Sequence, residues 1–327
     1  MEVMVLSLKE IEGLNIPVSE VMEVVEKGLV LKGEEKTEMP AKIGIHPRKD
    51  CFIHAMPCYA GGNSDVAGIK WVAGYPINQA KGLPYITGVM CLNDSETGFA
   101  KAIMDANWIT AWRTGAATGV CARYMANPDS ETISIIGLGV QGRTNTMALA
   151  EALPKLKTVK AYDPFESQVA KFTSLVKPDL KGVDIVACKT VEEAVKDADV
   201  VVTCTPIVAD PERFVRSEWL KKEMLAVAVD YDSAFDADVM SDATAFVCDD
   251  MHQYLWTQEH GIYFQKGYPT ESQILGDMGH LCAGKKKVEL KGRRAAVLMG
   301  IASHDVMTAS LIFDKAKAMG VGRMVEI

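Results

Sequence analysis

Apolar and polar positions in the second half of the chain alternate between the periods of strands and helices. Strands are predicted at residues 131–136, 158–162, 183–188, 200–205, 225–229 and 245–248, and the helices between them include 143–153 and 191–196. Short β-branched runs such as Val200–Val202 are typical of strands that are buried on both faces. This alternation predicts an α/β domain with a parallel sheet and helices on both of its faces.

The first half of the chain has a different pattern. A strand is predicted at 2–8 and an amphipathic helix at 18–32, followed by short strands at 42–46, 51–57, 66–73, 85–92 and 99–104. The last two strands flank a turn and are expected to form a hairpin. Apolar residues then recur at every fourth position of one long helix over 105–126, which ends at Asn127-Pro128-Asp129. We therefore expect an α+β N-terminal domain with its boundary at residue 128.

The C-terminal region is predicted to return to the first domain. Residues 295–319 have a mostly helical pattern and lie beyond the last predicted strand. The expected organisation is a domain of residues 1–128, joined by a C-terminal helix at about 303–327, and an α/β domain of residues 129–302.

A glycine motif follows the strand at 131–136. Gly137, Gly139 and Gly142 have the G-x-G-x-x-G spacing, and a helix comes directly after them. In a dinucleotide-binding turn these glycines permit the tight turn, the approach of a pyrophosphate and close helix packing, and the helix N-terminus offers N–H groups to the phosphates. The alternative is a glycine-rich turn in another kind of βα unit.

An acidic residue lies where an adenosine ribose is expected. Asp163 follows the next predicted strand, 21 residues after Gly142. A carboxylate at this place accepts hydrogen bonds from the ribose hydroxyls and repels a 2′-phosphate. Strand, glycines, helix and acid together favour a Rossmann-type domain that binds NAD(H) rather than NADP(H).

Composition narrows the class of protein further. The 327 residues suffice for two domains, and a net charge of −8 without a basic stripe argues against nucleic-acid binding. No run approaches the roughly 20 apolar residues of a membrane span, and the N-terminus lacks a signal-peptide pattern, so no membrane partner is expected. The eight scattered cysteines indicate reduced thiols in a cytoplasm, and no histidine or cysteine spacing supports a metal site.

Polar residues at predicted strand ends are candidates for chemistry, because open α/β sheets bind ligands at the carboxyl ends of their strands. Thr203 and Thr205 close one strand, and Asp230 follows another. A carboxylate near a nicotinamide is well placed to transfer a proton to an amine or imine. Position alone is equally compatible with an aspartate that caps a helix or forms a turn.

Three cations of the N-terminal domain need either solvent or a partner. Lys70 lies inside an apolar strand, Arg113 lies beside the apolar stripe of the long helix, and Lys42 follows Met39-Pro40. Cations are almost never buried unpaired. Each of the three therefore either reaches solvent or meets a buried anion such as a substrate carboxylate.

Several segments together resemble the ornithine cyclodeaminase/μ-crystallin family. They follow in order over nearly the whole chain: Met56-Pro57, Gly68–Lys70, Ala111–Ala117, Gly137–Gly142, Val229-Asp230 and Ala302–Asp305. The resemblance implies a homodimer joined through an N-terminal domain that also binds substrate, with a Rossmann domain in the middle of the chain.

The resemblance also implies roles for individual residues. Lys70 and Asp230 would be catalytic. The substrate carboxylate would be bound by Lys42, Lys70 and Arg113, and the cofactor phosphates by Thr114 and the backbone of Val140 and Gln141. The chain departs from the ornithine cyclodeaminase pattern at His54, which replaces a glutamate, and after Asp230. His54 is either a substrate-binding residue or a core residue that needs one hydrogen-bond partner.

We expect an NAD(H)-dependent oxidoreductase that acts on the C–N bond of a small amino or imino acid by hydride transfer at the α-carbon. One alternative is a redox-neutral lyase of the ornithine cyclodeaminase type, which retains NAD, releases ammonia and needs a second acid, with Asp232 or His54 as candidates. The other is a non-catalytic small-molecule binder of the μ-crystallin type. The joint presence of Lys70, Arg113 and Asp230 weighs against that binder.

Overall fold

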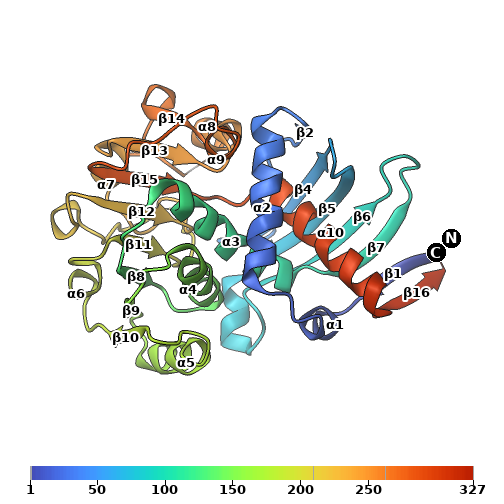
Figure 1. The fold of residues 1–327 in the computed structure, drawn as a ribbon, viewed down its shortest axis with the longest axis horizontal. Coiled ribbons are helices and arrows are strands. Elements are labelled where there is room, and N and C mark those ends of the chain that lie inside the picture. The colour runs from blue at the N-terminus through green and yellow to red at the C-terminus, as the bar shows by residue number, and fades with distance from the viewer. Residues whose placement is uncertain (1, 209, 262, 327) are drawn as a thin grey trace. The chain divides into compact units, whose positions relative to one another are not determined.

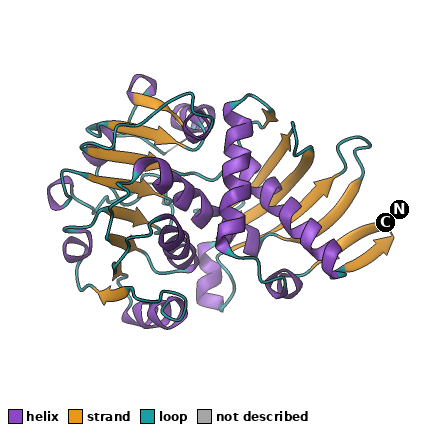
Figure 2. Cartoon of the chain, viewed as in Figure 1, coloured by secondary structure: helices purple, strands orange, loops and turns teal. Residues whose placement is uncertain are grey.

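The computed structural model describes residues 2–208, 210–261 and 263–326, so Met1 and Ile327, the outer ends of the predicted N-terminal domain, lie outside the description. The chain forms two compact units (Figure 1, Figure 2). Met1–Arg113 with Ile301–Ile327 is here called the mixed-sheet unit, and Thr114–Gly300 is called the parallel-sheet unit. The units divide inside helix α3 (Asn107–Met125), whereas the sequence sets the domain boundary at residue 128.

The parallel-sheet unit contains one sheet with the strand order β10-β9-β8-β11-β12-β15-β13-β14, and its neighbouring strands in the described ranges all pair in parallel. The strands are β8 (Thr132–Ile136), β9 (Thr158–Tyr162), β10 (Asp184–Ala187), β11 (Val200–Thr203), β12 (Met224–Ala228), β13 (Ala245–Cys248), β14 (Ile274–Asp277) and β15 (Arg293–Val297). The helices are α4 (Val140–Ala152), α5 (Glu166–Val176), α6 (Val191–Val195), α7 (Ala237–Ser241), α8 (Met251–His260) and α9 (Met278–Cys282), with 3-10 turns at Ser217–Trp219 and Glu271–Gln273. The predicted α/β fold class is confirmed.

The order of the strands marks one edge of this sheet as a ligand site. The chain runs from β8 outward through β9 and β10, and then returns to the other side of β8 with β11 and β12. The direction of winding therefore reverses between β8 and β11. Open α/β sheets bind their ligands at this reversal, outside the carboxyl ends of the strands.

The helix predicted from residue 295 is wrong for its first residues. Arg293–Val297 forms β15, which pairs in parallel with both β12 and β13, and helix α10 (Ala302–Met319) begins only after Gly300, whose φ is +78°. Alanines 295 and 296 favour a helix in isolation, but burial between two strands decides the outcome. Strand β14 and the short helices α7, α8 and α9 were not predicted from the sequence.

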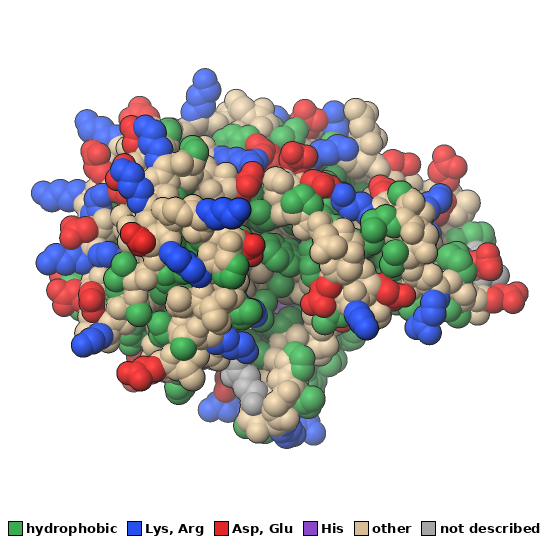
Figure 3. Space-filling view, turned by 60° about the horizontal axis from the view of Figure 1, so that its bottom comes forward, with side chains coloured by type: hydrophobic (Ala, Val, Ile, Leu, Met, Phe, Trp, Pro, Cys, Tyr) green, Lys and Arg blue, Asp and Glu red, His purple; other side chains and the backbone are tan. Residues whose placement is uncertain are grey.

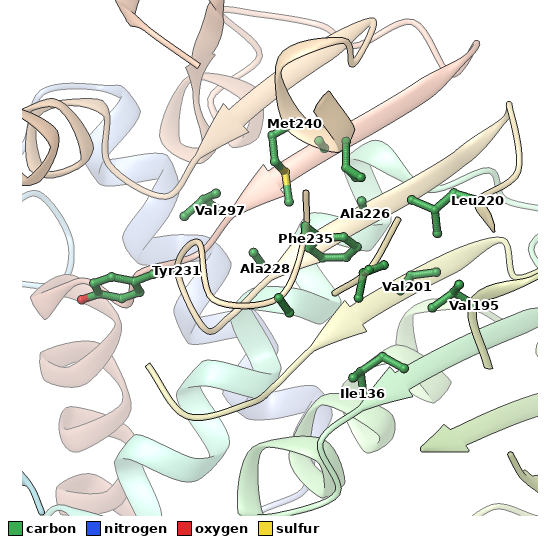
Figure 4. Packing of buried hydrophobic residues seen from close by; sticks show 14 of the residues in the cluster. Ile136, Val195, Val201, Leu220, Ala226, Ala228, Tyr231, Phe235, Met240 and Val297 are labelled. Atoms are coloured by element: carbon green, nitrogen blue, oxygen red, sulfur yellow. The ribbon is translucent and has the colours of Figure 1, made fainter. Parts of the chain in front are cut away.

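The core of the parallel-sheet unit packs large side chains against small ones. Phe235 and Met240 are fully buried and belong to one cluster with Ala226 and Ala228 of β12. Figure 4 shows Phe235 and Met240 beside these alanines, which leave room for the larger side chains. This packing fixes the chain that leaves β12, including the segment that contains Asp230.

The mixed-sheet unit contains a sheet in the order β16-β1-β7-β6-β5-β4-β2, with β3 paired to β4. The strands are β1 (Glu2–Leu6), β2 (Thr37–Glu38), β3 (Ile43–Ile45), β4 (Phe52–Ala60), β5 (Val66–Gly74), β6 (Ile86–Asn93), β7 (Ala100–Asp105) and β16 (Arg323–Glu326); the helices are α1 (Leu8–Gly13), α2 (Val18–Gly33), α10 and the first part of α3, with a 3-10 turn at Pro76–Lys81. The predicted hairpin of β6 and β7 is confirmed by their antiparallel register. Helix α1 was not predicted, although Ser7 and Glu10 form a capping box that the sequence contains.

One face of this sheet is covered and the other carries exposed apolar side chains. Helix α10 packs on β4, β5 and β6, and α2 packs on α10. Along β5, Lys70 and Val72 are buried, whereas Trp71 between them is 44% exposed. Val89 of β6 lies opposite Trp71 and is 49% exposed. The period of two along the strands thus separates a core face from an open face.

The surface is of mixed charge. Lys and Arg side chains are interspersed with Asp and Glu side chains on the face shown in Figure 3, and they form no stripe of a single sign there. None of the helices in the described ranges is long and apolar enough to cross a membrane.

Gly142→Ala is expected to lower the free energy of unfolding by about 1 kcal/mol or more. The added Cβ would lie 2.3 Å from the carbonyl oxygen of Gly137, and such overpacking outweighs the gain of about 1 kcal/mol that alanine brings to a helix. Gly139→Ala is the matched control, because its Cβ would meet no atom within 4 Å. Urea unfolding followed by circular dichroism measures both variants, and equal stabilities would contradict the packing role of Gly142.

Candidate active site

The glycine turn after β8 has the geometry of a phosphate-binding turn. Gly137 has a φ of +92°, and a Cβ there would lie 2.6 Å from the carbonyl oxygen of Cys204. A Cβ at Gly142 would collide with Gly137, so these two positions require glycine for backbone reasons. Gly139 is exposed, and no atom would lie within 4 Å of a Cβ on it. The turn therefore leaves open space where a pyrophosphate needs it.

The N-terminus of helix α4 is available to an anion. Gly139 is the N-cap residue, and its lack of a side chain leaves the first N–H groups of the helix without a side-chain cap. The next residue, Val140, is 51% exposed. N–H groups without a side-chain cap and the positive end of the helix dipole suit phosphate oxygens, so the residues present fit a dinucleotide.

Asp163 lies beside this turn. Its Oδ2 accepts a hydrogen bond from the backbone N–H of Leu138 at 3.0 Å, and its Oδ1 accepts one from the N–H of Phe165 at 3.0 Å. The carboxylate thus ties the end of β9 to the glycine turn. An ionised carboxylate has further lone pairs, which remain suited to ribose hydroxyls.

Helix α3 approaches α4 closely within the parallel-sheet unit. A Cβ on Gly115 would lie 2.4 Å from the carbonyl oxygen of Thr144, so the two helices meet backbone to backbone. Thr114 precedes this contact and is buried. Its predicted contact with cofactor phosphates is compatible with this neighbourhood of α4.

Asp230 is held rigidly at the carboxyl end of β12. Thr203 Oγ1 donates a hydrogen bond to Oδ1 at 2.6 Å, and Oδ2 accepts bonds from the N–H and Oγ1 of Thr205 at 2.9 and 2.5 Å. Burial raises the pKa of Asp230 above its ordinary value, although these hydrogen bonds act in the opposite direction. The side chains of Thr203 and Thr205, predicted to contact the cofactor, are thus engaged with Asp230.

Asp232 forms an ion pair. Its Oδ2 lies 2.8 Å from Arg213 Nη2 and also accepts the backbone N–H of Phe264 at 3.0 Å. The Arg213 guanidinium lies 4.4 Å from the centre of the Tyr268 ring. These contacts hold together the loop after β12 and the segment near residue 265, so the carboxylate of Asp232 has a structural role.

The mixed-sheet unit contains a buried ion cluster formed by Lys70, Arg113 and Asp305. Lys70 Nζ lies 2.7 Å and Arg113 Nε 2.9 Å from the same oxygen, Oδ1 of Asp305. Lys70 and Asp305 are fully buried, and the Arg113 side chain is 8% exposed. The sequence left open whether these cations reach solvent or meet a buried anion such as a substrate carboxylate. Within the protein both contact the carboxylate of Asp305 of α10.

Electrostatic effects within the cluster are strong. Burial, followed by the charge of Arg113, lowers the pKa of Lys70 to about 7, although Asp305 acts to raise it. Burial alone would raise the pKa of Asp305, but Lys70 and Arg113 hold it below its ordinary value. Lys70 is therefore close to its titration point at neutral pH, a property that suits a catalytic group.

Lys42 and His54 lie near this cluster. The His54 ring stacks on Phe52 with centroids 4.3 Å apart, and burial, with further effects from Lys42, His46 and Lys70, lowers the pKa of His54 to about 3. His54 is therefore an uncharged imidazole at neutral pH. The mixed-sheet unit thus brings together Lys42, His54, Lys70 and Arg113, the predicted substrate-binding residues.

Sequence reasoning missed Asp305 as a site residue. Ser303-His304-Asp305 is a run of three polar residues in a helix whose first eight residues are all buried, and this run was the available signal. His304 is also fully buried, and its pKa is lowered to about 3 by burial and by nearby cations. The described part of the chain contains no group of three or more His, Cys, Asp or Glu residues that would suit a metal ion.

Comparison with known proteins agrees with this architecture. The chain is 33% identical over 322 residues to nodulation efficiency protein NfeD of Rhizobium meliloti, a match that covers 98% of this chain and 97% of that protein. Two solved structures superpose over 98% or more of this chain and all of theirs. One is an archaeal alanine dehydrogenase dimer with bound NAD (TM-score 0.86, 30% identity), and the other is Thermococcus litoralis Δ1-pyrroline-2-carboxylate reductase with NADH and L-proline (TM-score 0.87, 28% identity).

One family model matches residues 1–320, almost the entire sequence. It confirms the resemblance carried by the glycine turn, by Lys70 and Arg113 and by Asp230. The chain belongs to the ornithine cyclodeaminase/mu-crystallin family.

Proposed function

We propose that this protein is an NAD(H)-dependent oxidoreductase that acts on the C–N bond of a small amino or imino acid. The observation that carries the proposal is the position of Asp230, a rigid buried carboxylate at the sheet edge where the glycine turn also lies. An acid–base group at that edge serves a reaction in which a nitrogen gains or loses a proton while the adjacent carbon is oxidised or reduced. Bound nicotinamide supplies or accepts the hydride.

Cofactor recognition is assigned to the parallel-sheet unit. The backbone of Val140, Gln141 and Gly142 holds the pyrophosphate, and Asp163 receives the ribose hydroxyls. The carboxylate of Asp163 favours NAD(H) over NADP(H). The solved relatives with bound NAD or NADH support this assignment.

Substrate recognition is assigned to the mixed-sheet unit. Lys70 and Arg113 bind the α-carboxylate, and Lys42 adds further positive charge beside them. Arg113 and Thr114 are consecutive residues, so one helix supplies both a carboxylate ligand and a cofactor contact. Fixing the carboxylate orients the α-carbon, and such positioning is worth several kcal/mol of barrier.

Proton transfer is assigned to Asp230, with Lys70 as a second titratable group. A carboxylate offers about four lone-pair sites. Thr203 and Thr205 donate three hydrogen bonds to Oδ1 and Oδ2, and a remaining lone pair can take the proton from the substrate nitrogen. The raised pKa of Asp230 brings its titration closer to neutral pH and makes the carboxylate a better base.

Two features favour net oxidation and reduction over the redox-neutral cyclodeaminase reaction. The cyclodeaminase reaction needs a second acid for the distal amine, and Asp232 is paired with Arg213. His54, the other candidate, is uncharged at neutral pH and lies among cations. A non-catalytic binder has no need of Asp230 beside the glycine turn.

A homodimer formed through the open face of the mixed sheet completes the proposal. Trp71 and Val89 lie opposite each other on that face and are exposed. Exposed apolar patches of this kind mark interaction sites, and a second copy would bury the patch. We also assign the protein to the cytoplasm, because its eight cysteines are free thiols.

The proposed activity predicts a net change in NADH. Single L-amino acids are expected to reduce NAD. In the opposite direction, a 2-oxoacid mixed with an amine, or a cyclic imine alone, is expected to oxidise NADH. Much weaker changes in absorbance are expected with NADP or NADPH. An ammonia assay runs beside each reaction. Release of ammonia without net NADH change would instead identify a cyclodeaminase, and NADH binding with no reaction would identify a binder.

Asp230→Asn is expected to lower kcat by about 10²–10⁴-fold while KM changes little, because the amide cannot take the proton. For amine oxidation, the wild-type rate should fall as pH drops through the raised pKa of Asp230, since only the carboxylate form is a base. Asp238→Asn is the control, an exposed aspartate in the same region. Undiminished turnover in Asp230→Asn would exclude the proposed role.

Trp71→Lys is expected to shift the protein from dimer to monomer, because a charge replaces the large apolar side chain on the open face of the mixed sheet. Sedimentation velocity measures the assembly state. Leu175→Lys serves as control, since it removes an apolar residue that is 45% exposed in the parallel-sheet unit. A dimer that persists in Trp71→Lys at low concentration would place the interface elsewhere.

A further inference from the structure

Asp305 is the best-buried charge in the mixed-sheet unit that has no assigned role. It lies in the first turn of α10 and is fully buried, and its Oδ1 accepts hydrogen bonds from both Lys70 and Arg113. Its Oδ2 is also buried and has no hydrogen-bond partner among the described residues. An unsatisfied buried oxygen costs free energy, so the cluster is not arranged to satisfy Asp305 fully.

The charges of this cluster do not balance. Two cations face one carboxylate, and the start of α10 further stabilises the negative charge of Asp305. When Lys70 is protonated, one positive charge is left over in a buried space. The titratable groups that face Lys70 and Asp305 do not offset this positive charge. His54 and His304 are neutral imidazoles, Cys58 is a thiol with a raised pKa, and Lys42 and Lys32 are further cations.

The cations keep donors for a second anion. Arg113 contacts Asp305 through Nε, and its guanidinium also carries the donors of Nη1 and Nη2. An ammonium has three donors, of which Lys70 gives one to Asp305. A substrate carboxylate can therefore bind both cations without displacing Asp305.

We propose that Asp305 is a positioning residue that holds Lys70 and Arg113 side by side as a preassembled receptor for the substrate carboxylate. The inference rests on the proposed function, because it assigns that carboxylate to the same two cations. Asp305 acts through Lys70 and Arg113 and does not itself touch the reacting atoms. Preassembly removes the cost of bringing two like charges together when substrate binds.

A pH dependence follows from this arrangement. The receptor is complete while Lys70 is charged, so carboxylate binding is present below the pKa of Lys70 and is lost as pH rises through it. In the wild type this pKa is about 7. Removing the charge of Asp305 removes the contribution that raises it, so the loss of binding moves to lower pH by about 1–3 units.

Asp305→Asn tests the proposal in the complete protein with NAD bound. Titration of Lys70 Nζ by NMR with isotope-labelled lysine, assigned with Lys70→Arg, is expected to show a lower midpoint than in the wild type. With L-alanine and L-proline as substrates, KM is expected to rise about tenfold or more above pH 7, with a smaller effect on kcat. An unchanged Lys70 midpoint would overturn the proposal.

Asp305→Glu separates geometry from charge. It keeps the anion but moves it by one methylene, so the Lys70 midpoint should stay near the wild-type value while KM rises severalfold; a wild-type KM would overturn the positioning role even if Asp305→Asn does not fold. Asp314→Asn, an exposed aspartate of the same helix, should change neither quantity. The Lys70 titration needs no turnover, so it still decides the role of Asp305 if neither amino acid is a substrate.

Discussion

The ion cluster of Lys70, Arg113 and Asp305 imposes the strictest condition on the mixed-sheet unit. Removing an ion from water costs several kcal/mol, and here the pairing through one shared oxygen offsets part of that cost. The three residues come from β5, α3 and α10, and Lys70 and Asp305 are separated by 235 positions in the sequence. The cluster can form only when the C-terminal helix returns to the N-terminal sheet, so the fold of this unit and its proposed receptor depend on the same contacts.

The parallel sheet brings its functional groups together by a different means. Parallel strands end at the same edge, and β8, β11 and β12 are consecutive in the sheet. The glycine turn, the two threonines and Asp230 follow these three strands, so separate parts of the sequence meet there. The threonines then fix the rotamer of Asp230, while Arg213 and Asp232 fix the loop that follows it. Backbone topology supplies the proximity, and short polar contacts supply the orientation.

Features with local signals could be predicted from the sequence. The glycine spacing, Asp163 and the β-branched strands depend on neighbouring residues, and their places agree with the structure. Strand β15 could not be recognised, because a short alanine-rich run favours a helix until two strands enclose it. Asp305 was missed as a partner because periodicity shows that a residue faces a core, but not which distant side chain it meets. The burial of Lys70 and Arg113 required an anion, and the sequence offered no way to choose it.

His54, which stands where ornithine cyclodeaminases have a glutamate, bears on which substrates suit the receptor. A glutamate at position 54 would place a negative charge near Lys42 and Lys70, where a distal ammonium of a diamino acid could bind. His54 is instead held neutral by burial and by the same cations. A second ammonium beside position 54 would therefore meet a neutral imidazole in place of a carboxylate. The side chain at position 54 therefore supplies no charge that would favour a diamino acid over an amino or imino acid with an uncharged side chain.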